Sequence, residues 1–341
     1  MRLERVAYML LITIAIVIIL IVGKDLIIPL IVALIVWFLI KEIRSGLKKI
    51  KWVRKTIPSW LLSTIAFIII FLVISLITKL LIFNIQELSK SLTAYQANVS
   101  TITSGINKLL KIDILNEIKD FIGDFDFTGL LTSVFTSITE IISDAFLILI
   151  YTLFLLLEET FFSVKIKALY PNIDKFREMN LLLKKIDNSI SRYLVLKTIV
   201  SVVTGILSYI VLISIGVDAP LFWAFIIFIL NYIPTIGSLI ATLFPTVFAF
   251  LQFGEILPGV LVLTLVGAVQ LVMGNLVEPR LMGDSLNISP LVVILSLTFW
   301  GAIWGILGMV LSVPMVVMII IITSEIPATR FIAVMLSKKG V

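Results

Sequence analysis

Long runs of apolar residues dominate the pattern along this chain, and the charged residues gather in the short stretches between them. The runs cover 6–22, 26–40, 57–83, 141–157, 193–215, 220–252, 256–277 and 288–324. A helix needs about 20 residues, each rising about 1.5 Å, to cross the hydrocarbon of a bilayer. The pattern therefore predicts about eight transmembrane segments.

The apolar runs are continuous, without the alternation of polar and apolar positions that is typical of a barrel strand. In lipid, every backbone polar group needs a partner within the protein, so only helices and closed barrels span a membrane. We therefore predict an all-α integral membrane protein with the lipid bilayer as its surroundings.

The first two runs are short and are separated by Gly23–Asp25, which predicts a helical hairpin over 6–40. The following loop, 41–56, holds one acid and many basic residues: Lys41, Arg44, Lys48, Lys49, Lys51, Arg54 and Lys55. Basic loops remain in the cytoplasm. We expect this loop, and the N-terminus two spans before it, to be cytoplasmic in a multi-pass protein of the cell membrane, and Lys338 and Lys339 indicate the same for the C-terminus.

The segment 84–140 is predicted to be an extracellular helical segment that continues the span 57–83. Apolar residues recur there at alternating steps of four and three, which is a heptad pattern: Leu81, Ile85, Leu88, Leu92, Tyr95, Val99, Ile102, Ile106 and Leu109. A hairpin within the chain and a seam between subunits are equally good interpretations, because a heptad does not name its partner.

Four segments follow from this organisation. Residues 1–83 carry the N-terminal spans, and 84–140 form the extracellular segment. Residues 141–192 hold a span and a cytoplasmic amphipathic helix, for which we favour an interfacial position over packing as a soluble helix. Residues 193–341 are predicted to be the transport core.

Two runs, 220–252 and 288–324, are too long for one span and are interrupted in the middle. Pro234 and Gly237 break the first, because proline lacks a backbone donor and glycine lets the chain turn. The second contains three glycines and a later proline: Gly301, Gly305, Gly308 and Pro314. Kinked spans and re-entrant hairpins are both open, and segment length favours hairpins, as at the solute sites of secondary transporters.

Polar residues lie at the first break and in the segment that follows it. Ionisable and amide groups within apolar segments are candidates for a functional site. Our substrate-binding candidates are Asn231, Thr235, Gln270, Asn275, Glu278 and Arg280. Plainer roles are open for some of them: Asn231 can cap the broken helix, and Glu278 can pair with Arg280 where the helix ends before Pro279. Pro279 and Gly283 are expected to be structural.

Composition narrows the function classes. The chain of 341 residues contains no Cys and no His, which excludes thiolate and imidazole metal sites and their catalytic triads. It has no nucleotide-binding glycine loop and no nucleophile–base arrangement. The net charge of +6 gathers beside the spans, as a topology signal does. We expect no enzyme activity, no cofactor, no metal and no nucleic-acid partner.

The C-terminal third resembles the autoinducer-2 exporter family, in its autoinducer-2 transport branch. The residues that carry the resemblance are NYIPTIG at 231–237, MGNLVEPRLMG at 273–283, SPLVVILSLTFWG at 289–301 and GMVLSVP at 308–314. The resemblance implies efflux of the quorum-sensing signal autoinducer-2, or sodium–proton antiport, which is linked to other members. It also implies a homo-oligomer, with a pentamer among the options.

Our first hypothesis is therefore an exporter of a small polar molecule, such as autoinducer-2, that works by alternating access at the broken helices. Amides and hydroxyls suit a ligand whose own hydroxyls need partners once it is dehydrated. A sodium–proton antiporter ranks second, since it needs a carboxylate at membrane depth. A non-transporting oligomeric scaffold, acting through 84–140, ranks third.

Overall fold

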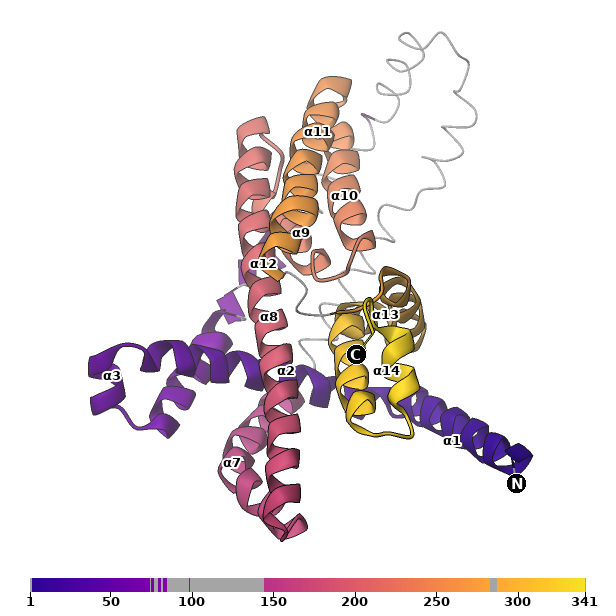
Figure 1. The fold of residues 1–341 in the computed structure, drawn as a ribbon. Helices are drawn as coiled ribbons and strands as arrows, with labels where there is room; N and C mark the ends of the chain where they lie inside the picture. Colours follow the sequence, from indigo (N-terminus) through magenta and orange to yellow (C-terminus); the bar gives the residue numbers. More distant parts are fainter. Residues whose placement is uncertain are drawn as a thin grey trace. The chain divides into compact units, whose positions relative to one another are not determined.

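The computed structural model describes residues 2–73, 75–76, 79–80, 82–84, 98, 144–282 and 287–340. These residues form helices joined by short turns, with one isolated bridge between Ile288 and Ser337. The named helices are α1 (Arg2–Val22), α2 (Lys24–Lys48), α3 (Lys51–Thr56), α7 (Ala145–Leu169), α8 (Ile173–Ile215), α9 (Pro220–Leu230), α10 (Ile236–Phe253), α11 (Ile256–Val272), the π-helix η1 (Met273–Val277), α12 (Glu278–Met282), α13 (Pro290–Glu325) and α14 (Arg330–Leu336) (Figure 1).

The predicted all-α membrane architecture is confirmed. Within the described residues, six helical stretches are long and apolar enough to cross a bilayer: Lys24–Lys48, Ala145–Leu169, Ile173–Ile215, Ile236–Phe253, Ile256–Met282 and Pro290–Glu325. Shorter apolar helices include Ser59–Val73 and Pro220–Leu230. The predicted heptad and extracellular helix of 84–140 lie outside the described residues, apart from Asn84 and Asn98.

The chain divides into two compact units, each assembled from separate stretches. The first unit comprises Met1–Phe67, Ile141–Val195 and Asp284–Val341. The second comprises Ile68–Glu140 and Leu196–Gly283. The sequence from α9 onward therefore contributes α9, α10, α11, η1 and α12 to the second unit and α13 and α14 to the first.

The predicted hairpin over 6–40 is not formed, because α1 and α2 continue through a kink at Gly23. The Gly23 N–H donates to the Ile19 carbonyl at 2.8 Å, and the Ile27 N–H donates to the Gly23 carbonyl at 2.9 Å. These bonds span four residues, as in an α-helix, and Gly23 has φ −85° and ψ 7°. A single residue between two helices bends the axis without reversing it.

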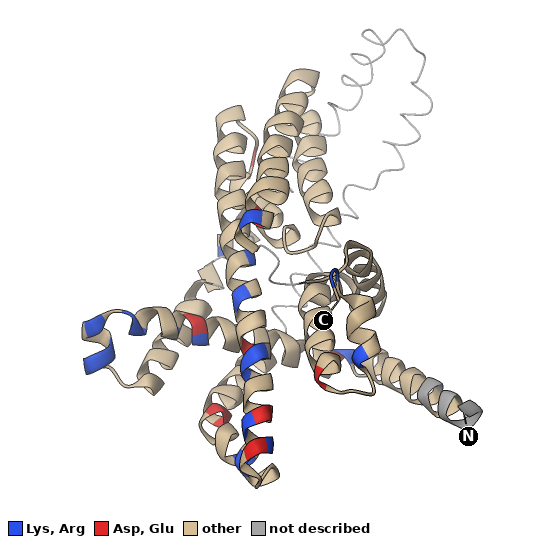
Figure 2. Cartoon of the chain, viewed as in Figure 1, with Lys and Arg blue, Asp and Glu red and all other residues tan. Residues whose placement is uncertain are grey.

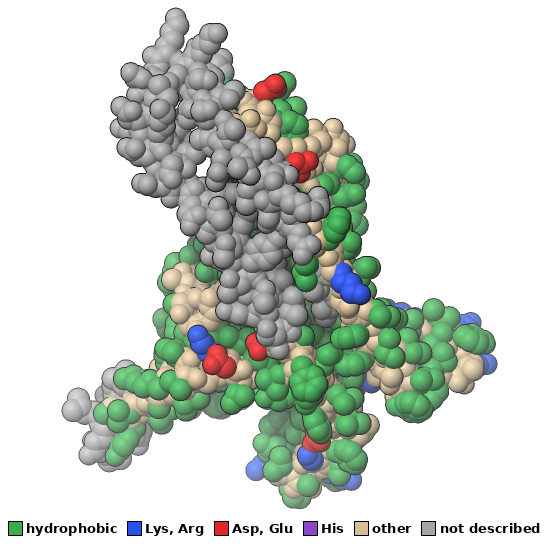
Figure 3. All heavy atoms as spheres, turned by 180° about the vertical axis from the view of Figure 1, so that it is seen from behind, with side chains coloured by type: hydrophobic (Ala, Val, Ile, Leu, Met, Phe, Trp, Pro, Cys, Tyr) green, Lys and Arg blue, Asp and Glu red, His purple; other side chains and the backbone are tan. Residues whose placement is uncertain are grey.

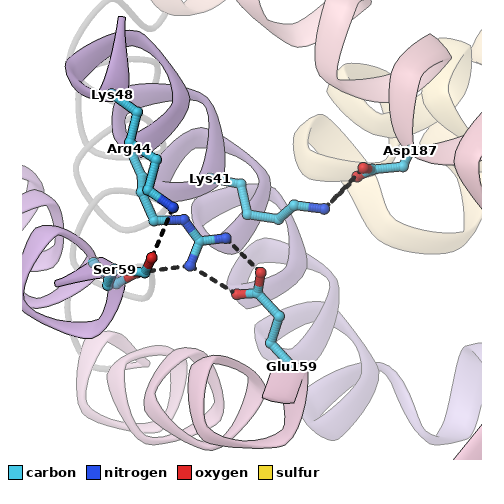
Figure 4. Close-up of polar contacts among 7 residues, drawn as sticks. Lys41, Arg44, Lys48, Ser59, Glu159 and Asp187 are labelled. Carbon is cyan, nitrogen blue, oxygen red and sulfur yellow. Dashed lines mark hydrogen bonds and ion pairs between the residues drawn. The ribbon is translucent and has the colours of Figure 1, made fainter. Parts of the chain in front are cut away.

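Ion pairs join α2 to α7 and α8 within the first unit (Figure 4). The Lys41 ammonium lies 2.7 Å from the Asp187 carboxylate on α8. The Arg44 guanidinium binds both carboxylate oxygens of Glu159 on α7. Asn172 begins α8, since its side-chain oxygen accepts a hydrogen bond from the Asp174 N–H at 2.8 Å, which is a typical N-cap.

In the second unit, the break at 231–237 reverses the chain, so that α9 and α10 form a helical hairpin. The rings of Trp223 on α9 and Phe248 on α10 lie 4.9 Å apart although 25 residues separate them. Gly237 makes the close approach possible, because a Cβ there would lie 1.9 Å from the Leu230 carbonyl oxygen. Thr235 precedes α10 with φ +60°.

In the first unit, α13 is also a hairpin, reversing at Gly305, which has φ +62° and ψ −141°. The Ser296 hydroxyl donates to the Ser312 carbonyl at 3.1 Å, although 16 residues of straight helix would place them about 24 Å apart. A Cβ at Gly308 would lie 1.9 Å from the Trp300 carbonyl oxygen. Trp300 and Trp304 at this tip pack on apolar residues of α1 and α2.

Candidate solute site in the second unit

One face of α8 in the second unit is polar and buried. Lys197, Ser201, Thr204 and Ser208 follow one another at steps of four, three and four residues, which places them on one side of the helix. Lys197 is 3 % exposed, and the three hydroxyl residues are fully buried. We call these four residues the polar face of α8. Helices α9, α10 and α11 carry no charged residue and are tan in Figure 2.

A buried ion pair closes one end of the polar face. The Lys197 ammonium donates to the Glu278 carboxylate at 2.5 Å, and the side chains are 4 % and 21 % exposed. An unpaired charge in an apolar interior is strongly unfavourable, so each residue makes burial of the other tolerable. The pair also joins α8 to α12 directly after the π-helix η1, and π-helical turns are frequent at functional sites.

The break of the first hairpin is hydrogen-bonded to the polar face. The Asn231 amide, 5 % exposed, donates to the Ser201 hydroxyl at 3.2 Å. Next to it, the Thr198 and Tyr232 hydroxyls are 2.7 Å apart. The chain reversal between α9 and α10 is thus held by polar groups rather than by apolar packing alone.

Gln270 on α11 is 5 % exposed, and neither its side-chain nitrogen nor its oxygen has a hydrogen-bond partner among the described residues. The same holds for the Ser208 hydroxyl. A buried amide without partners costs about 1–3 kcal/mol. These groups are therefore available to a polar ligand, which would offset that cost.

The ion pair fixes the height of Gln270 along the bundle. Leu212 on α8 and Val262 on α11 belong to one apolar cluster, so the two helices run antiparallel from the Lys197–Glu278 pair. Gln270 precedes Glu278 by eight residues, and Thr204 follows Lys197 by seven. At about 1.5 Å a residue, both lie about 11 Å from the pair. The unpartnered amide thus lies at about the height of Thr204 on α8.

Three predicted site residues lie elsewhere. Thr235, Asn275 and Arg280 are exposed. Arg280 does not form a salt bridge with Glu278, whose described partner is Lys197, because residues two apart on a helix point to different sides. Pro279 lies in α12, and Gly283 is outside the described residues. Among the predicted residues, Asn231 and Glu278 are bonded to side chains of α8. Gln270 lies at about the height of Thr204 on the same helix.

The sequence interpretation missed the polar face of α8. Its signal was present, since Lys197 is an ionisable residue inside the apolar run 193–215 and hydroxyls recur after it at helical spacing. The partner of Lys197 lies 81 residues away, so no local pattern could reveal the pair. Within the described residues, no group of three or more acids could hold a metal ion.

Long apolar helices, broken helices that form hairpins and a buried polar face are features that many membrane transporters share. The model of the AI-2E family of transporters matches residues 10–328, and the chain belongs to this family. It is 33 % identical over 319 residues to the AI-2 transport protein TqsA of Escherichia coli K12, covering 92 % of this chain and 90 % of that protein.

Two further relatives are putative transport proteins. The one from Haemophilus influenzae is 30 % identical, with 95 % of this chain and 94 % of the relative covered. The one from Borreliella burgdorferi is 29 % identical, with 90 % and 83 % covered. Similarity along almost the whole chain agrees with a multi-pass transport protein, as the sequence predicted.

Proposed function

We propose that this protein exports a small, polar, uncharged solute through the second unit, and that autoinducer-2 is the first solute to test. The observation that carries the proposal is the buried amide of Gln270, which has no hydrogen-bond partner among the described residues and lies at about the height of Thr204 on α8. The charges of Lys197 and Glu278 neutralise each other, so the groups left for a ligand are neutral donors and acceptors. The name of the Escherichia coli relative supports the choice of solute.

The two hairpins support alternating access as the mechanism. In our proposal they enter the bilayer as re-entrant hairpins, because the first arm of each, α9 in one and the part of α13 before Gly305 in the other, is short for a full crossing. Each depends on a glycine that admits close backbone contact, Gly237 in one and Gly308 in the other. The proposed movement breaks the bonds of Asn231 to Ser201 and of Lys197 to Glu278 in one state and forms them in the other.

We further propose a homo-oligomer in the cell membrane with both termini in the cytoplasm. The basic residues of 41–56 and Lys338 and Lys339 support this orientation. The chain has no cysteine. Single cysteines introduced at its termini can therefore be labelled from one side of intact cells without first replacing native cysteines. Labelling of either terminus by an impermeant reagent from outside would refute the orientation.

The decisive experiment compares autoinducer-2 flux with sodium–proton exchange in the same proteoliposomes. We expect saturable autoinducer-2 flux and its loss in Asn231→Ala and Gln270→Leu. The matched control is Thr264→Ala on α11, whose exposed hydroxyl donates only within its own helix. Normal flux in correctly assembled Asn231→Ala and Gln270→Leu variants would refute the site.

Sodium–proton antiport is the second candidate, favoured by the partly buried carboxylate of Glu278. Exchange without signal flux, abolished by Glu278→Gln, would establish it and overturn the exporter proposal. Absence of both fluxes in a folded, reconstituted protein would favour a scaffold.

A further inference from the structure

Residues 48–60 of the first unit form a corner where α2 ends, α3 runs and the helix Ser59–Val73 begins, and we call them the basic corner. Four basic side chains are exposed there: Lys49, Lys51, Arg54 and Lys55. None of them forms a salt bridge with an acid of the described residues. Figure 2 shows them as a blue cluster around α3.

Basic residues slightly earlier on α2 are treated differently. Lys41 pairs with Asp187, and Arg44 pairs with Glu159 (Figure 4). Their charges are neutralised within the protein. The positive charge of the basic corner is left for a partner outside the described chain.

The corner is held in shape by two side-chain bonds across it. The Lys48 ammonium donates to the Ser59 hydroxyl at 2.7 Å, and the Arg44 guanidinium donates to the Ser63 hydroxyl at 2.8 Å. These bonds tie the end of α2 to the start of the next apolar helix. A ligand would therefore meet cations whose backbone is already positioned, which lowers the entropy lost on binding.

Aromatic and aliphatic side chains stand among these cations. Trp52 is 68 % exposed and Trp60 is 69 % exposed, and Ile50 is exposed beside them. Figure 3, seen from behind, shows basic side chains at the rim of a largely hydrophobic surface at this end of the first unit. Exposed tryptophans next to lysines are typical of the level of lipid headgroups, where the ring lies against acyl chains and the ammonium against phosphate.

We propose that the basic corner binds the phosphate headgroup of an anionic membrane lipid. Four unpaired cations beside an apolar helix match the charge of such a headgroup, and juxtamembrane basic clusters attract anionic lipids. Orientation of the chain needs only the number of basic residues near a span. It does not account for the bonds that fix the corner or for the two exposed tryptophans.

The test measures energy transfer from tryptophan to dansyl-labelled phosphatidylglycerol and, separately, to dansyl-labelled phosphatidylcholine, with the full protein in mixed bilayers. Transfer to phosphatidylglycerol is expected to exceed transfer to phosphatidylcholine, and the double variant Trp52→Phe, Trp60→Phe should remove most of this excess. In the variant Lys51→Gln, Arg54→Gln, Lys55→Gln, the preference should fall at least about tenfold.

The matched control removes the same charge elsewhere, as Lys175→Gln, Arg177→Gln, Lys184→Gln on exposed positions of α8. It should keep the preference. Equal loss in both variants would show an effect of net charge alone and would overturn the proposal, as would equal transfer to the two lipids in the unaltered protein.

Removing basic residues from a loop can change the side of the membrane on which that loop lies. A measurement on the unaltered protein therefore completes the test. Raising the salt concentration shortens the Debye length from about 10 Å at 0.1 M to about 3 Å at 1 M. The lipid preference of the unaltered protein should fall in parallel. A preference that salt does not change would refute headgroup binding by these cations.

Discussion

The two helical hairpins share one backbone device but differ in what surrounds it. In each, a glycine lies where a Cβ would be 1.9 Å from a carbonyl oxygen eight or fewer residues earlier, Leu230 for Gly237 and Trp300 for Gly308. The first hairpin turns beside polar groups, since the Asn231 amide bonds to Ser201. The second turns on an aromatic tip, since the Trp300 and Trp304 rings lie 4.8 Å apart in an apolar cluster.

This difference points to two roles, solute contact and anchoring, although the two hairpins have similar sequence patterns. Polar groups in an apolar interior cost free energy, so they persist where a ligand or a switch uses them. Packed tryptophans instead fix an element in place. We therefore propose that the hairpin of α9 and α10 contacts the solute and that α13 anchors the first unit.

The largest expected effect tests the shared device. Gly237→Ala and Gly308→Ala each force a Cβ into a backbone oxygen, which no side-chain movement can relieve. We expect a destabilisation on the order of 4 kcal/mol or more and loss of monodisperse protein in size-exclusion chromatography. Gly46→Ala is the control, because no atom lies within 4 Å of its Cβ position. Equal thermal midpoints for Gly237→Ala and Gly46→Ala would contradict the hairpin.

The second effect concerns the ion pair at the end of the polar face. Lys197→Met leaves the Glu278 carboxylate partly buried without its partner, which should cost about 3–5 kcal/mol. The exchange Lys197→Glu, Glu278→Lys should restore part of the thermal midpoint and of the flux. Lys185→Met is the control, since its pair with Glu325 is about half exposed and worth at most about 1 kcal/mol.

Ser201→Ala should have a smaller effect. It removes the acceptor of the Asn231 amide and leaves that buried amide unpaired, at a cost of about 1 kcal/mol, which corresponds to roughly fivefold in flux. Ser214→Ala on the same helix is the control, because its exposed hydroxyl bonds only to the Ile210 carbonyl. Flux equal in the two variants would remove Ser201 from the site.

Apolar runs and helix breakers predicted most of the fold. Pro234 and Gly237 predict the first chain reversal. Proline disrupts a continuous helix, and glycine allows close contact between backbones. Gly23 looks similar in sequence but stays near helical, because its N–H and carbonyl still bond to residues four positions away. Whether a glycine bends or reverses a helix depends on packing that its neighbours in sequence do not reveal.

The candidate site was predicted in part for a related reason. Asn231, Gln270 and Glu278 stood out as polar residues in apolar segments, and the structure brings two of them to α8. Lys197 escaped notice because it lies only four residues inside its run. Its role depends on Glu278, a partner that only the folding of α8 against α12 supplies.

Trp304→Phe should have the smallest effect, and it tests most directly whether the two hairpins have different roles. The Trp304 indole N–H donates to the Leu20 carbonyl, in the last turn of α1, at 3.0 Å. Phenylalanine keeps the ring packing and loses this bond, which should lower stability by about 1 kcal/mol. Flux should not change, because an anchoring hairpin does not touch the solute. Trp60→Phe, 69 % exposed, controls for the loss of an indole. Reduced flux at unchanged stability would mean that the second hairpin also contacts the solute, and the division of tasks between the two hairpins would fail.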